Sequence, residues 1–157
     1  MMQHPPIQIL LVEDNADHAE LIRRNLEAIP FRCELHRVED GESALDYIFG
    51  TRHFADRKKF PLPQLVLLDL RLPRLNGVEV LRLVKNNPQF AFLPIVVLTT
   101  SDAEQDLTMA LQCGATKFLT KPVEADVLVR LFLGLGFEPA GLVNAGSPVP
   151  SPRISQS

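Results

Sequence analysis

Residues 7–14 read IQILLVED, a largely apolar run that ends in two acids. Three later runs have the same form: LVLLD ends in Asp69, PIVVLT ends in Thr99, and KFLTKP ends in Lys121 and Pro122. Short apolar runs that alternate with longer helical patterns are typical of parallel strands covered on both faces. The sequence therefore predicts an α/β fold built on a parallel sheet.

The segments between these runs show helical spacing of their apolar residues, and the first of them has Asn15 or Asp17 available as its N-cap. We expect helices over residues 16–29, 42–49, 77–85, 103–112 and 124–135, and strands over residues 7–12, 32–38, 64–69, 95–99 and 116–119. Residues 50–63 carry two prolines and no periodicity, which predicts a surface loop or a polar extension of the second helix.

The chain of 157 residues has the size of one domain. We expect an N-terminal arm over residues 1–6, a folded domain over residues 7–137, and a tail over residues 138–157. The tail is rich in Pro, Gly, Ser and Ala, a composition that buries too little apolar surface to fold, so we expect it to be disordered.

Composition disfavours several classes of function. The formal net charge of −3 argues against a nucleic-acid-binding surface, and no helix-turn-helix pattern follows the domain. Cys33 and Cys113 are the only cysteines and lack metal-ligand spacing, which suggests a reducing compartment. No segment has the features of a signal peptide or approaches the ~20 apolar residues of a membrane span. We therefore expect a cytoplasmic protein with no direct contact with DNA or membranes.

The polar residues at the ends of the four runs are expected to meet. Carboxyl ends of parallel strands share one edge of the sheet, where ligands bind. This edge would carry Glu13, Asp14, Asp69, Thr99 and Lys121. Three carboxylates, a hydroxyl and an amine in one pocket suit Mg²⁺-dependent phosphoryl transfer to an aspartate.

The ordered set of these motifs resembles the receiver domain of a two-component response regulator, over roughly residues 7–137. The resemblance is carried by Glu13-Asp14, Asp69, Asn76-Gly77, Thr99, Gly114-Ala115 and Lys121-Pro122. It implies a doubly wound, flavodoxin-like, five-stranded parallel sheet of order 2-1-3-4-5. The long 50–63 segment, the Leu-Thr-Thr-Ser stretch at 98–101 and the lack of an output domain are similar to the single-domain regulators that serve phytochrome-type sensor histidine kinases.

The resemblance implies a role for each pocket residue. Asp69 would be the phosphoacceptor. Glu13, Asp14, Asp69 and the backbone carbonyl of Arg71 would hold Mg²⁺ or Mn²⁺. Thr99 and Lys121 would bind the phosphoryl group.

Further positions would control the response. Phe118 would be the switch aromatic, Arg71 and Ser101 would tune the lifetime of the phosphate, and Pro122 would follow a cis peptide bond. The sensor histidine kinase, which the resemblance suggests is a bacteriophytochrome, would dock beside the first helix, near Ala16, Ala19, Glu20 and Arg23. The histidines at positions 4, 18, 36 and 53 show no pattern suited to a relay or a metal site.

The last helix is apolar nearly all round, so a part of it would be exposed without a partner. In the family, phosphorylation biases the surface made by the fourth helix, the fifth strand and the fifth helix. We therefore expect a homodimer through this surface. Its predicted residues are Leu107, Leu111, Phe118, Val127, Arg130, Leu131, Phe132 and Leu133.

Three other readings are open to this sequence. A haloacid-dehalogenase-like phosphohydrolase needs an acid two residues after its nucleophile, where this chain has Arg71. A flavodoxin-like cofactor binder needs a hydroxyl- and glycine-rich loop after the first strand, where this chain is acidic. A pseudo-receiver would be a pure interaction module that takes up no phosphate.

Overall fold

The computed structural model describes residues 5–100 and 104–140. In this part of the chain, five parallel strands form one sheet of order β2-β1-β3-β4-β5, the order that the resemblance implied. The strands are β1 (Ile7–Val12), β2 (Cys33–Val38), β3 (Leu65–Asp69), β4 (Ile95–Thr99) and β5 (Lys117–Thr120). The predicted α/β sheet is therefore confirmed.

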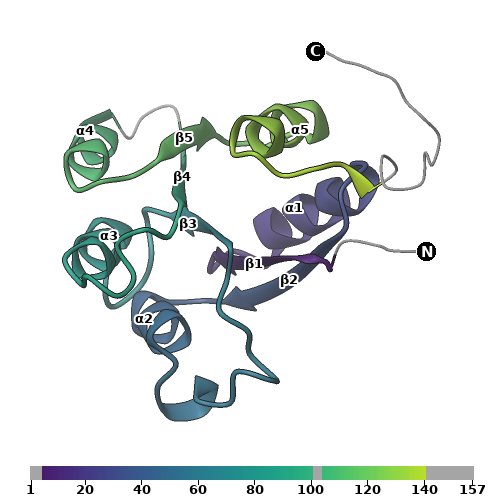
Figure 1. The fold of residues 1–157 in the computed structure, drawn as a ribbon. Helices are drawn as coiled ribbons and strands as arrows, with labels where there is room; N and C mark the ends of the chain where they lie inside the picture. The colour runs from purple at the N-terminus through teal and green to yellow at the C-terminus, as the bar shows by residue number, and fades with distance from the viewer. Residues whose placement is uncertain (1–4, 101–103, 141–157) are drawn as a thin grey trace.

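Helices cover both faces of the sheet (Figure 1). They are α1 (Ala16–Ala28), α2 (Gly41–Phe49), α3 (Gly77–Lys85), α4 (Glu104–Gln112) and α5 (Ala125–Gly134), with a short 3-10 helix η1 (Arg52–Phe54). One apolar core joins α1 and α5 to the sheet, and a second joins α2, α3 and α4 to its other face. The central strands β3 and β4 are buried throughout, because their side chains point alternately to the two faces of the sheet and each face packs into one of the two cores.

The helix ends agree with the predictions to within a few residues. Asn15 rather than Asp17 is the N-cap of α1, since its side chain accepts a hydrogen bond from the backbone N–H of His18 (3.0 Å). That helix stops at Ala28 because Ile29 has an extended backbone before Pro30. Ser101 lies outside the described residues.

Residues 50–63 form a loop with one 3-10 turn and do not extend α2. The helix ends at Gly50, which adopts a left-handed backbone (φ 69°) that suits glycine. The Arg57 guanidinium then donates to the carbonyl oxygens of Tyr47 (2.8 Å) and Ile48 (2.6 Å), two acceptors at the end of the helix. The loop is therefore tied to the helix that precedes it.

The described chain continues for three residues past position 137, where we expect the folded domain to end. Glu138 to Ala140 are described, and the backbone N–H of Ala140 donates to the carbonyl of Pro30 (2.9 Å). This contact ties the chain at Ala140 to the α1–β2 turn, and the domain boundary at residue 137 stays a prediction. The rest of the predicted tail, residues 141–157, lies outside the described residues.

Two residues assigned to the dimer surface are in the core. Leu131 is 4% exposed and Phe132 is fully buried, with its ring 5.1 Å from that of Phe31. The apolar sequence of α5 did not show which side faces the sheet, and the structure turns these two side chains inward. Of the other predicted residues, Leu111, Phe118, Arg130 and Leu133 are exposed, and Leu107 and Val127 are half-buried.

Among the described residues, no helix combines the length and the apolar character that a transmembrane span requires.

Candidate functional site

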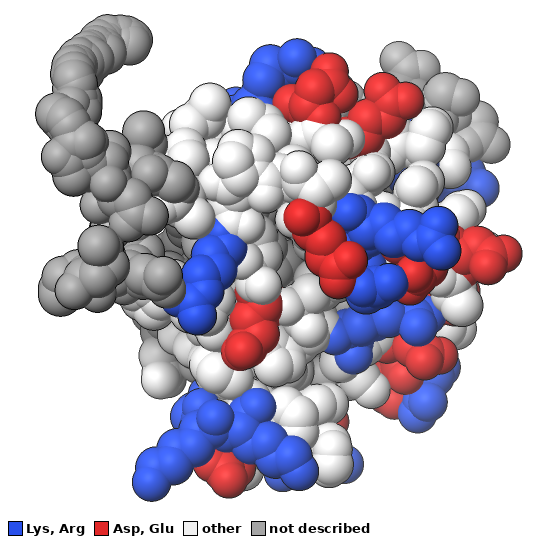
Figure 2. Space-filling view, turned by 90° about the vertical axis from the view of Figure 1, so that its right-hand side faces the viewer, with Lys and Arg blue, Asp and Glu red and all other residues white. Residues whose placement is uncertain are grey.

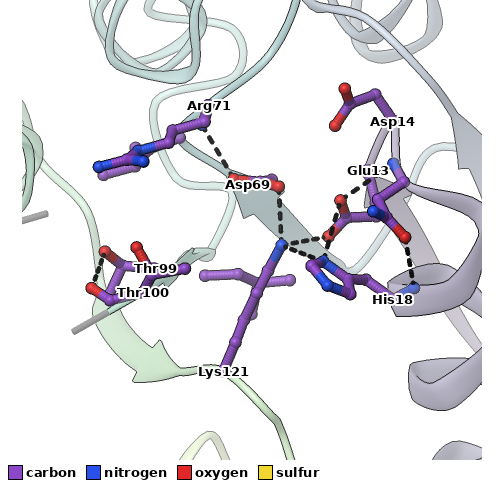
Figure 3. Close-up of a pocket in the computed structure, with 11 residues that line it drawn as sticks. Glu13, Asp14, His18, Asp69, Arg71, Thr99, Thr100 and Lys121 are labelled. Atoms are coloured by element: carbon purple, nitrogen blue, oxygen red, sulfur yellow. Dashed lines mark hydrogen bonds and ion pairs between the residues drawn. The ribbon is translucent and has the colours of Figure 1, made fainter. Parts of the chain in front are cut away.

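The carboxyl edge of the sheet gathers the predicted polar residues into one pocket (Figure 3). Parallel register places Asp69 of β3 beside Leu98 of β4, and Thr99 beside Thr120 of β5, so that Lys121 follows directly. The residues that line the pocket are Glu13, Asp14, Asn15, His18, Asp69, Leu70, Arg71, Leu98, Thr99, Thr100 and Lys121.

Lys121 links the two buried acids of the pocket. Its ammonium nitrogen lies 2.7 Å from Glu13 Oε1 and 2.8 Å from Asp69 Oδ2. Burial by itself lowers the pKa of Lys121, but the hydrogen bonds to Asp69 and Glu13 outweigh it, so the pKa is raised. The lysine therefore stays charged and partly balances the acids. It is held by its own backbone too, because its N–H donates to the carbonyl of Thr99 (2.8 Å).

Glu13 is fully buried at the end of β1. Burial raises its pKa to about 7, and the neighbouring Asp69 adds to this rise, while Lys121 opposes it. A carboxylate in this position is short of compensating positive charge. A bound cation would supply that charge.

Glu13, Asp14 and Asp69 fit a divalent metal ion. Each offers a carboxylate oxygen, and these oxygens lie within 4.8 Å of one another. Asp14 is exposed, so the group opens to solvent and leaves room for the waters that Mg²⁺ keeps. Arg71 lines the same pocket, and its backbone N–H donates to Asp69 Oδ1 (2.9 Å). The use of its carbonyl as a metal ligand stays a prediction.

Thr99 reaches the pocket and Phe118 does not line it. Thr99 is 5% exposed, and its hydroxyl donates to the carbonyl of Thr100 (3.1 Å). Phe118 is 44% exposed on β5. The Lys121-Pro122 peptide bond is cis, as predicted.

His18 is a pocket residue that the sequence analysis missed. Its Nδ1 lies 3.2 Å from Lys121 Nζ and 3.9 Å from Glu13 Oε2. A helix that starts directly after Asp14 places its first turn over the same end of the sheet. The position of His18 in that turn was therefore a signal, although spacing alone could not show that its side chain meets Lys121.

Comparison with known proteins agrees with this geometry. The family model for the response regulator receiver domain matches residues 9–132. The chain belongs to this receiver domain family. It is 42% identical over 125 residues to the probable methanogenesis regulatory protein FilR2 of Methanothrix harundinacea (strain 6Ac), covering 80% of this chain and 78% of FilR2.

Two further relatives have solved structures. One is bound to Mn²⁺, and the other is described as a phytochrome response regulator. Response regulator Rcp1 of Synechocystis sp. (strain ATCC 27184 / PCC 6803 / Kazusa) is 34% identical over 84% of this chain and 88% of its own. The crystal structure of the Mn²⁺-bound form of response regulator Rcp1 matches with a TM-score of 0.68 at 34% identity, over 83% of this chain and 91% of that chain. The phosphorylated cyanobacterial phytochrome response regulator RcpA matches with a TM-score of 0.71 at 32% identity, over 83% and 91% of the two chains.

Family membership bears on two of the three other readings, because a pseudo-receiver would belong to the same family. The match covers residues 9–132, which include most of β1 and all of the other strands, and places the acid pocket within a family of signalling proteins. It favours neither a phosphohydrolase nor a flavodoxin-like cofactor binder.

Proposed function

We propose that this receiver domain accepts a phosphoryl group on Asp69 from a sensor histidine kinase in a Mg²⁺-dependent reaction. The observation that carries the proposal is the Asp69 carboxylate held 2.8 Å from Lys121 Nζ within a cluster of three acids. The chain would catalyse only its own phosphorylation and dephosphorylation.

The pocket supplies the groups that the reaction needs. An oxygen of Asp69 attacks phosphorus, the P–N bond of the phosphohistidine breaks, and its electron pair stays on the imidazole, which takes up a proton. Lys121 is placed to pair with the transferred group, and the Thr99 hydroxyl can turn from the Thr100 carbonyl to a phosphoryl oxygen. When bound, Mg²⁺ supplies positive charge to the phosphoryl oxygens.

The relatives support a phytochrome-type kinase as the donor. RcpA is described as a cyanobacterial phytochrome response regulator and was crystallised in its phosphorylated form. Another matching structure is that of the bacteriophytochrome response regulator AtBRR, with 37% identity and a TM-score of 0.75, over 86% of this chain and 96% of that one. We place the kinase beside α1 and the protein in the cytoplasm, in keeping with the free thiols of Cys33 and Cys113.

We propose protein contact, not DNA binding, as the output. Phosphorylation would change the surface of α4, β5 and α5, which we infer to be a homodimer interface centred on Leu111, Phe118 and Leu133. Figure 2 shows acidic and basic side chains intermixed on the face it presents, except at the lower edge, where basic ones predominate. That distribution, with a formal net charge of −3, does not favour the polyanion DNA.

Intact-mass spectrometry with acetyl phosphate, with and without Mg²⁺, tests the proposal. One added phosphate is expected only with Mg²⁺, and it should be absent from Asp69→Asn. Beryllofluoride binding distinguishes a protein whose phosphate forms and is rapidly hydrolysed from a protein that takes up no phosphate. A wild-type protein that takes up neither phosphate nor beryllofluoride would refute the proposal in favour of a pseudo-receiver.

A further inference from the structure

His18 lines the pocket but has no part in the transfer described above. It lies in the first turn of α1, where its backbone is fixed by the bond to Asn15 Oδ1 (3.0 Å). Its side chain is 49% exposed. It borders both the acidic pocket and an adjoining apolar groove lined by Leu21, Ile22, Pro122 and Val123.

Among the residues that the structure describes, three side chains lie within hydrogen-bond distance of the Lys121 ammonium group, and His18 is the third. An ammonium group carries three N–H donors and no acceptor. Glu13 Oε1 lies at 2.7 Å, Asp69 Oδ2 at 2.8 Å and His18 Nδ1 at 3.2 Å (Figure 3). Each of these atoms can take one N–H, and because an ammonium group has no acceptor, a hydrogen bond to His18 requires that Nδ1 accept and that the ring proton be on Nε2.

The third acceptor differs from the other two in charge. Glu13 and Asp69 belong to the cluster that fits a divalent cation, so a bound cation would compete with Lys121 for their oxygens. His18 adds no carboxylate to that cluster, so it brings no negative charge that would repel the transferred phosphoryl group. A lysine side chain has many rotamers, so an acceptor independent of the cation limits its movement.

We propose that His18 is a positioning residue, which holds the Lys121 ammonium group beside Asp69 through Nδ1. This role rests on the proposed phosphorylation of Asp69. Loss of one such hydrogen bond is expected to slow phosphorylation about 2- to 10-fold. The affinity for the metal should change less than 2-fold, because His18 contributes no carboxylate to the metal cluster.

The test compares His18→Leu with His18→Asn. Asparagine places its amide Oδ1 close to where histidine has Nδ1, whereas leucine keeps bulk and has no acceptor. Leu21→Ala is the matched control, since Leu21 shares the apolar groove with His18 but does not line the acidic pocket. Rates of phosphorylation by acetyl phosphate at saturating Mg²⁺ are followed by intact mass, and Mn²⁺ affinity is measured by electron paramagnetic resonance of the free ion.

The proposal expects His18→Leu to be slow, His18→Asn to recover most of the rate, and Leu21→Ala to match the wild type, all with similar Mn²⁺ affinity. A wild-type rate in His18→Leu would overturn it, and so would equal slowing in His18→Leu and His18→Asn. In both of those cases the wild type is still phosphorylated, so the function of Asp69 stands. A wild type that is not phosphorylated at all would overturn both proposals together.

Discussion

Gly41 sets the distance between α2 and the loop that follows Asp69, the proposed phosphoacceptor. A Cβ atom added at Gly41 would lie 2.1 Å from the carbonyl oxygen of Leu75 and 2.8 Å from the Leu75 Cβ. Leu75 belongs to the β3–α3 loop, which joins Asp69 to α3 and contains Arg71. The loop and the helix therefore touch backbone to backbone, and any residue other than glycine at position 41 has to push them apart.

The size of the effect of Gly41→Ala follows from this contact. The loop must move by more than about 1 Å, because the 2.1 Å contact has to open to at least the 3.4 Å of ordinary van der Waals contact. Ala44 and Ile48 anchor α2 in the core with no exposed surface, so the loop is the side that gives way. Overpacking of this kind costs about 1–3 kcal/mol of unfolding free energy. A shift of about 1 Å near reacting atoms can lower a rate by up to ~100-fold, so we expect a loss of phosphorylation beyond the loss of stability.

Urea unfolding and acetyl phosphate labelling of the same Gly41→Ala preparation measure the two effects. Gly134→Ala is the control, because its added Cβ would meet only Lys117 Nζ, at an ordinary 3.7 Å. We expect the control to keep the wild-type rate and to be at least as stable as the wild type, because alanine favours a helix more than glycine does. Wild-type behaviour of Gly41→Ala in both assays would refute the reasoning, since it would mean that the close contact with Leu75 does not constrain the loop.

Two further predictions concern pH and assembly. Burial raises the pKa of Glu13 from 4.5 to about 7, so the folded protein binds more protons than the unfolded chain between these values, and metal-free stability should fall as pH rises through this window. Urea unfolding in EDTA at pH 5 and pH 8 measures this loss of unfolding free energy, and Glu13→Gln should make the loss smaller. An equal loss in the variant and the wild type would show that Glu13 is not its source. For assembly, Phe118→Ala with Leu133→Ala should weaken a homodimer at least ~10-fold by light scattering, because each truncation removes apolar area from both subunits. The control Phe92→Ala, which truncates a side chain exposed between α3 and β4, should leave the dimer affinity unchanged. An unchanged dimer affinity in the double variant would exclude this interface.

The sequence was a good guide wherever one rule of geometry was sufficient. Parallel strands place their carboxyl ends together, so Glu13, Asp69, Thr99 and Lys121 could be assigned to one pocket before the fold was known. The apolar runs themselves defined β1, β3 and β4, because strands buried on both faces have little alternation.

It was a poor guide where a contact depends on how two elements approach. The side of α5 that faces the sheet could not be read from a helix that is apolar nearly all round, so Leu131 and Phe132 were wrongly placed on the surface. One ring partner of Phe132 is Phe31, about a hundred residues earlier in the chain, and no local pattern links these two. His18 was missed for the same reason, since its contact with Lys121 depends on the packing of α1 against the β5–α5 turn.

The charges of the pocket connect its stability to its chemistry. Three carboxylates share the site with the single lysine that lines it among the described residues, and one of those acids is fully buried. With no cation bound, Lys121 has to bridge Glu13 and Asp69, and the raised pKa of Glu13 reflects the remaining cost of burial. A cation and a phosphoryl group together would release Lys121 from this bridge and give it a new partner. The cluster is therefore unfavourable in charge by itself, because the fold holds these acids close to one another, and binding of a cation and a phosphoryl group would relieve that cost.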